Sequence, residues 1–323
     1  MRCVALADAL VERGDAATFF LDPESDGLQD VPAAHGHDVQ VLASDRLDEF
    51  ARAVRPGRFD GLVVDGYRFN EAAQRRFHEV VPVRLVIDDL ARPSRVAEMI
   101  LNQNLGSRPS DYAGRIRADA QLLLGLRYAL LRREFGHRAP RVIQARASRI
   151  LITMGGEDQA NVTGIAVRAL ERLSVEPLSV KILLGPRFRH ADVLKRQCGG
   201  GSHRYELMAN SDRVGEAMDW ADLGVVACGT TVWECLACTL PLIVVPVAEN
   251  QYRVAHELAR RQLVRVLPAR AQVTEERLSA AIEPLLSDQA ARERFSRAGR
   301  QMVDGLGAIR VAEALRGHGA TPA

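Results

Sequence analysis

Short apolar runs alternate along the chain with segments in which apolar residues recur every three or four positions. The runs are rich in Val, Ile and Leu, which is typical of strands that are buried on both faces. The intervening segments have the spacing of amphipathic helices. Because strands and helices alternate, the pattern predicts an α/β protein with parallel sheets.

The first half of the chain opens with a predicted helix, Arg2–Arg13, which ends at Gly14. The strands expected after it are Ala17–Leu21, Asp38–Leu42, Gly61–Asp65, Arg84–Asp89, Met99–Asn104 and Gln121–Gly125. A doubly wound domain normally begins with its first central strand and a glycine-rich turn. We therefore expect the first strand of this domain to be missing from the sequence.

The second half repeats the alternation more regularly, after a basic stretch that contains Pro140. Its expected strands, with helices between them and two helices after the last, are Arg149–Gly155, Val180–Gly185, Arg204–Leu207, Leu223–Ala227, Leu242–Val247 and Val264–Leu267. The change of pattern predicts two Rossmann-like domains, 1–147 and 148–323. A chain of 323 residues is long enough for two such domains.

Composition narrows the possible function classes further. With 43 basic and 41 acidic residues the net charge is +2, and only 5% of residues are aromatic, which argues against nucleic acid as a partner. Only two of the basic residues, Lys181 and Lys195, are lysines. No apolar run approaches the roughly 20 residues of a membrane span. Because no signal-peptide pattern opens the chain, we expect a cytoplasmic protein without membrane contact.

Five cysteines raise the question of a metal or redox site, since Cys235 and Cys238 form a Cys-x-x-Cys pair. No second pair and no histidine pair accompany it, and the surrounding stretch is apolar and helical, where cysteine behaves as a small hydrophobic residue. The sequence also has no Ser/His/Asp arrangement, no HExxH motif and no P-loop. We expect no metal and no cofactor.

The strongest local signal is a buried strand that is followed by Gly229, Thr230 and Thr231 at the start of a helix. Free N–H groups and the positive end of the helix dipole would face a bound anion there. Glu234 lies one turn further along, where a carboxylate can accept hydrogen bonds from two sugar hydroxyls. An ordinary capped helix explains the same pattern equally well.

Two more strand ends in the second half carry candidate residues. Asn250 and Gln251 follow the strand Leu242–Val247, and Gly155 and Gly156 lie at the end of the first strand of this half. Ligands of open α/β sheets bind at the carboxyl edge of the strands. Each segment alone is compatible with a simple loop, but the three strand ends together favour a binding face.

In the first half, Tyr67, Asp88, Asn102 and Asn104 stand at or just after strand ends, and we expect them to point into a cleft between the domains. Helix N-capping is a strong alternative for Asp65 and for Asp89, which also stand at strand ends. Because adjacent strand residues point to opposite faces, at most one of Asp88 and Asp89 serves a site.

Seven segments follow one another in a characteristic order: Leu62-Val-Val-Asp-Gly-Tyr67, Val86-Ile-Asp-Asp-Leu90, Leu101-Asn-Gln-Asn104, Leu124-Gly-Leu-Arg-Tyr-Ala-Leu-Leu-Arg-Arg-Glu-Phe135, Met154-Gly-Gly-Glu-Asp158, Gly229-Thr-Thr-Val-Trp-Glu234 and Glu249-Asn-Gln251. Together they resemble the UDP-2,4-diacetamido-2,4,6-trideoxy-β-L-altropyranose hydrolase family of pseudaminic acid biosynthesis, to which spore-coat polysaccharide proteins are related. The Gly-Thr-Thr segment is shared with UDP-sugar glycosyltransferases of the same fold.

The resemblance implies a two-domain GT-B fold whose last helix crosses back to the first domain. It implies that UDP lies on the second domain, with the pyrophosphate at Gly229–Thr231 and the ribose at Glu234. Asn250 and Gln251 would then contact the pyrophosphate or the sugar, and the four candidates of the first half would face the sugar.

The reaction that the resemblance implies is metal-independent hydrolysis. Water attacks the anomeric carbon, the C–O bond breaks with inversion, and UDP leaves; a helix N-terminus suits the charge that grows on the diphosphate. The catalytic histidine of the family lies in a Gly-x-Gly-His turn that would precede Met1, so no catalytic residue is assigned. We expect a monomeric enzyme; the alternatives are a UDP-sugar glycosyltransferase and an inactive UDP-sugar binding protein.

Overall fold

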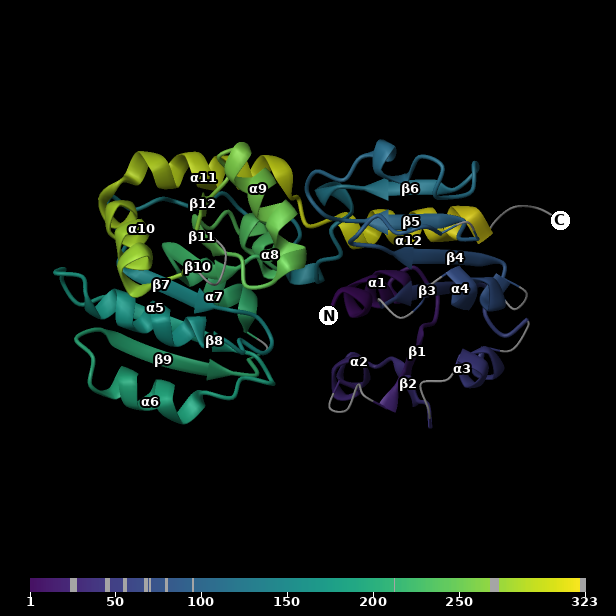
Figure 1. Ribbon diagram of the computed structural model, residues 1–323, viewed down its shortest axis with the longest axis horizontal. Helices are drawn as coiled ribbons and strands as arrows, with labels where there is room; N and C mark the ends of the chain where they lie inside the picture. The colour runs from purple at the N-terminus through teal and green to yellow at the C-terminus, as the bar shows by residue number, and fades with distance from the viewer. Residues whose placement is uncertain are drawn as a thin grey trace. The chain divides into compact units, whose positions relative to one another are not determined.

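The computed structural model describes the chain apart from residues 24–27, 44–46, 55–56, 67–68, 70, 79–80, 95, 212, 268–272 and 320–323. The chain divides into two compact units (Figure 1). Unit 1 comprises Met1–Gly136 together with Gly305–Ala323, and unit 2 comprises His137–Asp304. The division expected from the sequence, at 147/148, lies inside unit 2. Residues 137–147 pack there, as when the N–H of Ala147 donates to the carbonyl of Leu286 (2.8 Å).

Unit 2 is built on six parallel strands in the order β12-β11-β10-β7-β8-β9. Their bounds are β7 Arg149–Thr153, β8 Ser179–Leu184, β9 Arg204–Ala209, β10 Leu223–Ala227, β11 Leu242–Val245 and β12 Arg265–Val266. Successive residues of the central strands are buried, as at Ile150, Leu151 and Ile152, so that both faces of the sheet are covered. The strand order changes direction between β7 and β10, which is the switch point of a doubly wound sheet.

The helices of unit 2 are α5 Val162–Glu171, α6 Ala191–Gly199, α7 Val214–Trp220, α8 Thr231–Ala237, α9 Tyr252–Arg260, α10 Glu275–Ser287 and α11 Gln289–Met302, with the 3₁₀ turn η5 Glu249–Gln251 before α9. Helices α5 and α10 pack together, and their apolar residues share one core with β7, β8 and β10. Among the described residues, the three helices α10, α11 and α12 (Gly307–Gly319) follow β12, where the sequence pattern predicts two. Asp288 separates α10 from α11, because its side chain caps α11 by accepting from the N–H of Ala291 (2.8 Å).

Unit 1 contains a four-stranded parallel sheet in the order β3-β4-β5-β6 and a separate parallel pair, β1 and β2. The strands are β1 Thr18–Leu21, β2 Asp38–Val41, β3 Gly61–Asp65, β4 Val83–Ile87, β5 Met99–Asn102 and β6 Gln121–Leu124. The helices are α1 Arg2–Val11, α2 Asp30–Ala34, α3 Leu47–Ala53, α4 Glu71–His78 and α12 Gly307–Gly319, with the 3₁₀ turns η2 Pro109–Tyr112, η3 Leu126–Tyr128 and η4 Arg133–Phe135. The sequence pattern did not predict the short α2, which contains Pro32.

The last helix of the chain, α12, packs against the first, α1 (Figure 1). Leu6 of α1 and Val311 of α12 are buried in one apolar cluster with Leu85 of β4. The chain re-enters unit 1 at Gly305, where φ is +75° and an added Cβ would lie 2.2 Å from the carbonyl oxygen of Phe135. Only glycine fits there, and the last helix completes the core of the first unit.

The two sheets of unit 1 share a core although no ladder joins them. Among the described strands, β3 pairs only with β4 and β1 pairs only with β2. Phe20 of β1 nevertheless packs in one cluster with Leu62 and Val64 of β3. Within the described parts of both units, no helix combines the length and the apolar character that crossing a membrane requires.

Candidate functional site

The start of α8 leaves backbone N–H groups available just after a buried strand. β10 ends at Ala227, and the N–H of Gly229 donates back to the carbonyl of Ala227 (2.9 Å). The N–H of Val232 is the first to bond within the helical turn, to the carbonyl of Gly229 (3.1 Å). No side chain caps α8, and no described residue accepts a hydrogen bond from the N–H of Thr230 or Thr231. Because Gly229, Thr230 and Thr231 are half-buried, an anion can reach these donors.

Helix α5 differs from α8, because side chains of the protein accept hydrogen bonds from its first backbone N–H groups. The buried carboxylate of Asp158 accepts hydrogen bonds from the N–H groups of Val162 and Thr163, both at 2.8 Å. The side chain of Asn161 caps the same turn. The acid and the amide after the first strand of unit 2 therefore stabilise a helix, and α5 has no open N-terminus to offer a ligand.

Gly155 and Gly156 lie in the loop between β7 and α5, and Gly185 at the end of β8 packs directly against that loop. A Cβ added at Gly185 would lie 2.4 Å from Gly156 Cα and 2.6 Å from the carbonyl oxygen of Gly155. Gly155 itself has a φ of +83°, which favours glycine. The carbonyl of Gly156 accepts from the N–H of Arg187 (3.0 Å). Glycine at positions 155 and 185 thus lets two loops meet at the carboxyl edge of the sheet.

The loop after β11, the third predicted strand end, is hydrogen-bonded to the segment just before α8. The thiol of Cys228 donates to the carbonyl of Gln251 (3.7 Å), and the N–H of Cys228 donates to the carbonyl of Val245 (3.0 Å). Gln251 Oε1 accepts from the N–H of Val247 (2.9 Å), so this side chain shapes its own loop. Asn250 belongs to η5, and its side chain lies outside the described residues. Because β7, β10 and β11 are adjacent, all three loops lie at one edge of the sheet.

The cysteines near this edge pack in the core. Cys235 and Cys238 of the Cys-x-x-Cys pair are buried, together with Trp233. Burial raises the pKa of Cys228 to about 12 and holds the pKa of Cys235 well above its ordinary value, so these thiols stay neutral. Glu234 is half-buried in the first turn of α8. In the described part of the chain, no group of three His, Cys, Asp or Glu side chains could hold a metal ion.

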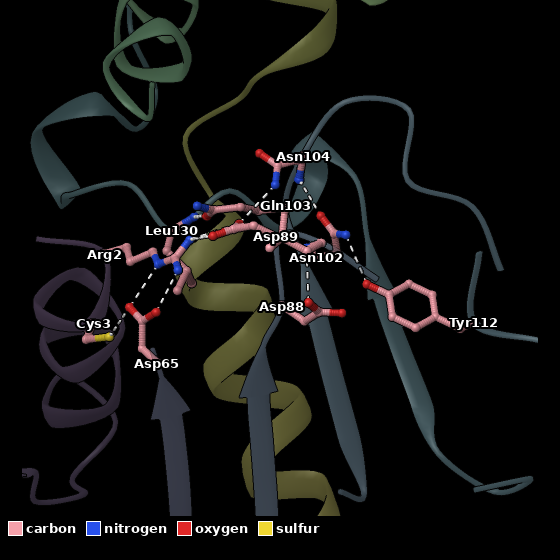
Figure 2. A network of polar contacts seen from close by, with 11 residues as sticks. Arg2, Cys3, Asp65, Asp88, Asp89, Asn102, Gln103, Asn104, Tyr112 and Leu130 are labelled. Carbon is pink, nitrogen blue, oxygen red and sulfur yellow. Dashed lines mark hydrogen bonds and ion pairs between the residues drawn. The ribbon is translucent and has the colours of Figure 1, made fainter. Parts of the chain in front are cut away.

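In unit 1, two of the predicted residues, Asp88 and Asn102, form hydrogen bonds within the protein (Figure 2). Both oxygens of the buried Asp88 accept backbone hydrogen bonds, from the N–H of Leu90 (3.0 Å) and of Arg92 (2.8 Å). The buried Asn102 donates from Nδ2 to the hydroxyl of Tyr112 (2.9 Å). Burial raises the pKa of Tyr112, which keeps this hydroxyl protonated. Asp88 and Asn102 therefore shape the loops after β4 and β5.

Arg2, Asp65 and Asp89, which are not among the predicted binding residues, meet beside the predicted Asn104 (Figure 2). Nε and Nη2 of Arg2 donate to the two oxygens of Asp65 (2.9 and 2.6 Å), and Nη1 donates to both oxygens of Asp89 (3.0 and 2.9 Å). Burial alone would raise the pKa of Asp65, but the hydrogen bonds and charge of Arg2 outweigh it and hold that pKa below its usual value. Asn104 donates from Nδ2 to Asp89 Oδ1 (2.9 Å). Tyr67, the remaining predicted residue, lies outside the described residues.

Comparison with known proteins identifies distant relatives of this chain. The glycosyltransferase family 28 C-terminal domain matches residues 149–306. The chain is 20% identical to the spore coat polysaccharide biosynthesis protein SpsG of Bacillus subtilis, over 98% of this chain and 93% of that protein. It is 22% identical to the UDP-2,4-diacetamido-2,4,6-trideoxy-β-L-altropyranose hydrolase of Campylobacter jejuni, over 69% of this chain and 79% of that protein. It is also 23% identical to MJ1062 of Methanocaldococcus jannaschii over 70% of this chain, a match that spans 48% of MJ1062, about half its length.

Solved glycosyltransferase structures share the fold. MurG of Acinetobacter baumannii superposes with a TM-score of 0.69 at 14% identity, over 98% of this chain and 95% of that chain. LpCGTa, solved in complex with UDP, superposes with a TM-score of 0.63 at 12% identity, over 99% and 96%. These likenesses confirm the expected α/β fold of GT-B type with two Rossmann-like domains. In sequence the chain is similar to SpsG and to the UDP-2,4-diacetamido-2,4,6-trideoxy-β-L-altropyranose hydrolase, and in fold to the GT-B glycosyltransferases.

Proposed function

We propose that this protein hydrolyses a UDP-linked diacetamido-trideoxy sugar at the anomeric C–O bond, and releases UDP and a free sugar for the synthesis of pseudaminic acid or a related nonulosonic acid. The observation that carries the proposal is the uncapped start of α8, where Thr230 and Thr231 follow the buried strand β10. A helix start of this kind suits a diphosphate. The named hydrolase of Campylobacter jejuni supports the class of reaction.

Unit 2 would hold the UDP part of the substrate. The backbone N–H groups and hydroxyls at Gly229–Thr231 would bind the diphosphate, and Glu234 would accept hydrogen bonds from the ribose. Asn250 and Gln251 would contact the diphosphate or the sugar. The loop of Gly155 and Gly156 would line the same edge, since β7 is the neighbour of β10 in the sheet. On unit 1, the sugar would meet the residues predicted from the sequence.

In the proposed reaction, a water oxygen forms a bond to the anomeric carbon while the bond from that carbon to the β-phosphate oxygen breaks. The electron pair of the broken bond stays on UDP, and the proton that the attacking water loses is released to the solvent. The anomeric configuration inverts because water and UDP lie on opposite faces of the ring. The N–H groups of Thr230 and Thr231 would stabilise the negative charge that grows on UDP. We assign no residue as the acceptor of the water proton.

A UDP-sugar glycosyltransferase is the second candidate. It is favoured by the family 28 match over residues 149–306 and by the glycosyltransferase neighbours among solved structures. The same UDP site would serve it, with the hydroxyl of an acceptor in place of water. The two candidates differ only in the group that attacks the anomeric carbon.

Product analysis separates the candidates. The protein is incubated with UDP-2,4-diacetamido-2,4,6-trideoxy-β-L-altropyranose without any acceptor, and the products are followed by NMR. We expect equal amounts of UDP and free sugar, with inverted anomeric configuration in the product that forms first. Turnover that requires an added acceptor would identify a glycosyltransferase, and UDP binding without turnover would identify a binding protein.

The UDP site is tested separately by calorimetry with UDP. Thr231→Val removes the hydroxyl at nearly constant volume, and we expect UDP to bind about tenfold more weakly, the effect of one hydrogen bond to a charged group. Ser279→Ala, which removes a solvent-accessible hydroxyl from α10 of the same unit, is the matched control and should bind UDP like the wild type. Equal affinity in Thr231→Val and the wild type would contradict this place for the diphosphate.

A further inference from the structure

Arg2 joins three elements of unit 1 at one point (Figure 2). It is the first residue of α1, Asp65 is the last residue of β3, and Asp89 follows the end of the neighbouring strand β4. The N–H donors of Arg2 are divided between the two carboxylates, at distances of 2.6 to 3.0 Å. A guanidinium can make such contacts with two partners at once because its donors are fixed in one plane. Both carboxylates are therefore held in set orientations.

Asp89 in turn fixes the orientation of the Asn104 side chain. An ionised carboxylate can only accept hydrogen bonds, so the NH₂ end of the Asn104 amide faces Asp89 Oδ1, at 2.9 Å. The backbone of Asn104 is held as well. Its N–H donates to Asn102 Oδ1 (3.1 Å), and its carbonyl accepts from the hydroxyl of Ser107. With these three contacts, a flip of the Asn104 amide would set its oxygen against a carboxylate.

The amide oxygen of Asn104 is the group that remains for a ligand. Figure 2 shows this oxygen directed away from the network, and no described residue donates a hydrogen bond to it. Asn104 is also partly exposed.

We infer that Arg2 is a positioning residue that acts through Asp89 to present the Asn104 amide oxygen as an acceptor for a hydrogen-bond donor on the sugar, a hydroxyl or an acetamido N–H. The inference rests on the proposed function. It adds that, in the sugar contact on unit 1, the protein accepts the hydrogen bond and the sugar donates it. A phosphate group cannot take this place, since phosphate oxygens and the amide oxygen are both acceptors.

The test compares Arg2→Gln, Asn104→Leu and the double variant. The measurements are kcat/KM for the release of UDP from UDP-2,4-diacetamido-2,4,6-trideoxy-β-L-altropyranose, and Kd for UDP alone. We expect each single variant to lower kcat/KM about tenfold, the effect of one lost hydrogen bond to the substrate. The Kd for UDP should stay unchanged. The double variant should match Asn104→Leu, because Arg2 acts only through the amide that this change removes.

Arg13→Gln is the matched control. Arg13 follows the other end of α1 and pairs at the surface with Glu313 (3.0 Å), so its loss should leave both measurements unchanged. Thermal melting of every variant shows whether unit 1 stays folded. If Arg2→Gln melts below the assay temperature, Arg2→Lys takes its place. Lysine keeps the charge and loses the planar fork, and we expect the same fall in kcat/KM.

The possible outcomes separate this inference from the proposed function. Additive losses in the double variant, or an unchanged kcat/KM in Arg2→Gln, would overturn the inference and leave the function standing. A fall in UDP affinity in Arg2→Gln would also overturn it, because Arg2 would then act on the fold as a whole. A wild-type protein that releases no UDP contradicts the proposed function itself.

Discussion

The guanidinium of Arg141 donates a hydrogen bond to the carbonyl of Cys238, the C-cap residue of α8, over 3.1 Å. It also donates to the carbonyls of Met218 (2.7 Å) and Asp219 (2.9 Å) near the end of α7. One cation thus satisfies the last carbonyls of two helices and complements their dipoles. The opposite end of α8 is the open N-terminus proposed for UDP, so Arg141 secures the helix that presents it.

Buried arginines of this kind account for part of the preference of the chain for arginine over lysine. Arg292, which is 1% exposed, donates to the carbonyls of Leu285 and Leu286 at the end of α10, and Arg84 donates to that of Val96. A guanidinium offers five donors in a fixed plane, which suits several carbonyls at once. These arginines stabilise the interior of the protein, and their number does not point to a polyanionic partner.

Replacement of Arg141 by methionine is expected to lower the free energy of unfolding by about 2–4 kcal/mol, because buried carbonyls lose their donors. The loss stays below the sum of the separate bonds because burial lowers the pKa of Arg141, which means that the charge itself is costly to bury. Urea unfolding measures the change. The control is Arg146→Met, which breaks an exposed 3.7 Å pair with Glu176 and should cost less than about 0.5 kcal/mol. Equal stability of the two variants would contradict the capping role.

Asp222 is expected to make unit 2 sensitive to acid. Burial alone would raise the pKa of this carboxyl, but hydrogen bonds from Arg149 and from the backbone N–H of Ser148 outweigh it and hold the pKa below its usual value. The stabilisation is therefore complete above the unfolded pKa of about 3.9 and is lost as the pH falls through the folded pKa. Asp222→Asn should cost about 1–3 kcal/mol at neutral pH. In urea unfolding, the difference in free energy of unfolding between this variant and the wild type should become smaller below about pH 4. A difference that does not change with pH would contradict the prediction.

Gly185→Ala is expected to destabilise unit 2 by about 2–3 kcal/mol, because the new methyl group would collide with backbone atoms of Gly156. The displaced loop of Gly155 and Gly156 should also bind UDP more weakly. Gly317→Ala is the control, since Gly317 lies in α12 with open space around it and alanine should stabilise the helix by about 0.5–1 kcal/mol. Thermal melting and calorimetry with UDP check both variants. The steric argument fails if Gly185→Ala melts like the wild type.

Asp158→Ala should lower the free energy of unfolding by about 1–2 kcal/mol, because two N–H groups of α5 lose their acceptor. The adjacent Glu157→Ala removes an acid that is half-buried, without a cap to break, and should leave stability within about 0.5 kcal/mol of the wild type. Urea unfolding of the two variants measures the difference. If both acids prove equally dispensable, Asp158 does not hold the start of α5.

Much of the fold could be predicted because strand and helix patterns are local. β3 and β10 have the bounds expected from their apolar runs, Gly61–Asp65 and Leu223–Ala227. The features that the sequence pattern did not predict are also local. The short α2 contains Pro32, which is not typical of a helix interior, and the cap at Asp288 divides one apolar pattern into two helices. Neither feature changes the periodicity of buried positions, which is the signal that the prediction used.

The candidate site could be predicted only in part. The Gly229–Thr231 turn is contiguous, so its chemistry is visible in the sequence. Arg2, in contrast, lies 63 residues before Asp65 and 87 before Asp89, and an arginine at a helix start gives no local sign of either partner. Asp158 shows the reverse case, since an acid at a strand end suggests a ligand until its acceptors are found to cap a helix.

The sequence by itself determined the alternation of strands and helices, the two-domain α/β architecture and the turn that opens α8, because burial periodicity and helix starts depend on neighbouring residues. Only the tertiary structure decided which polar groups are occupied and which remain open. Asp88 and Asp158 are satisfied by backbone N–H groups, whereas Thr231 at the start of α8 and the Asn104 oxygen are not paired with any described residue. The physical reason is that hydrogen bonds and ion pairs depend on distance and direction, and distant residues acquire these only when the strands that carry them pack side by side.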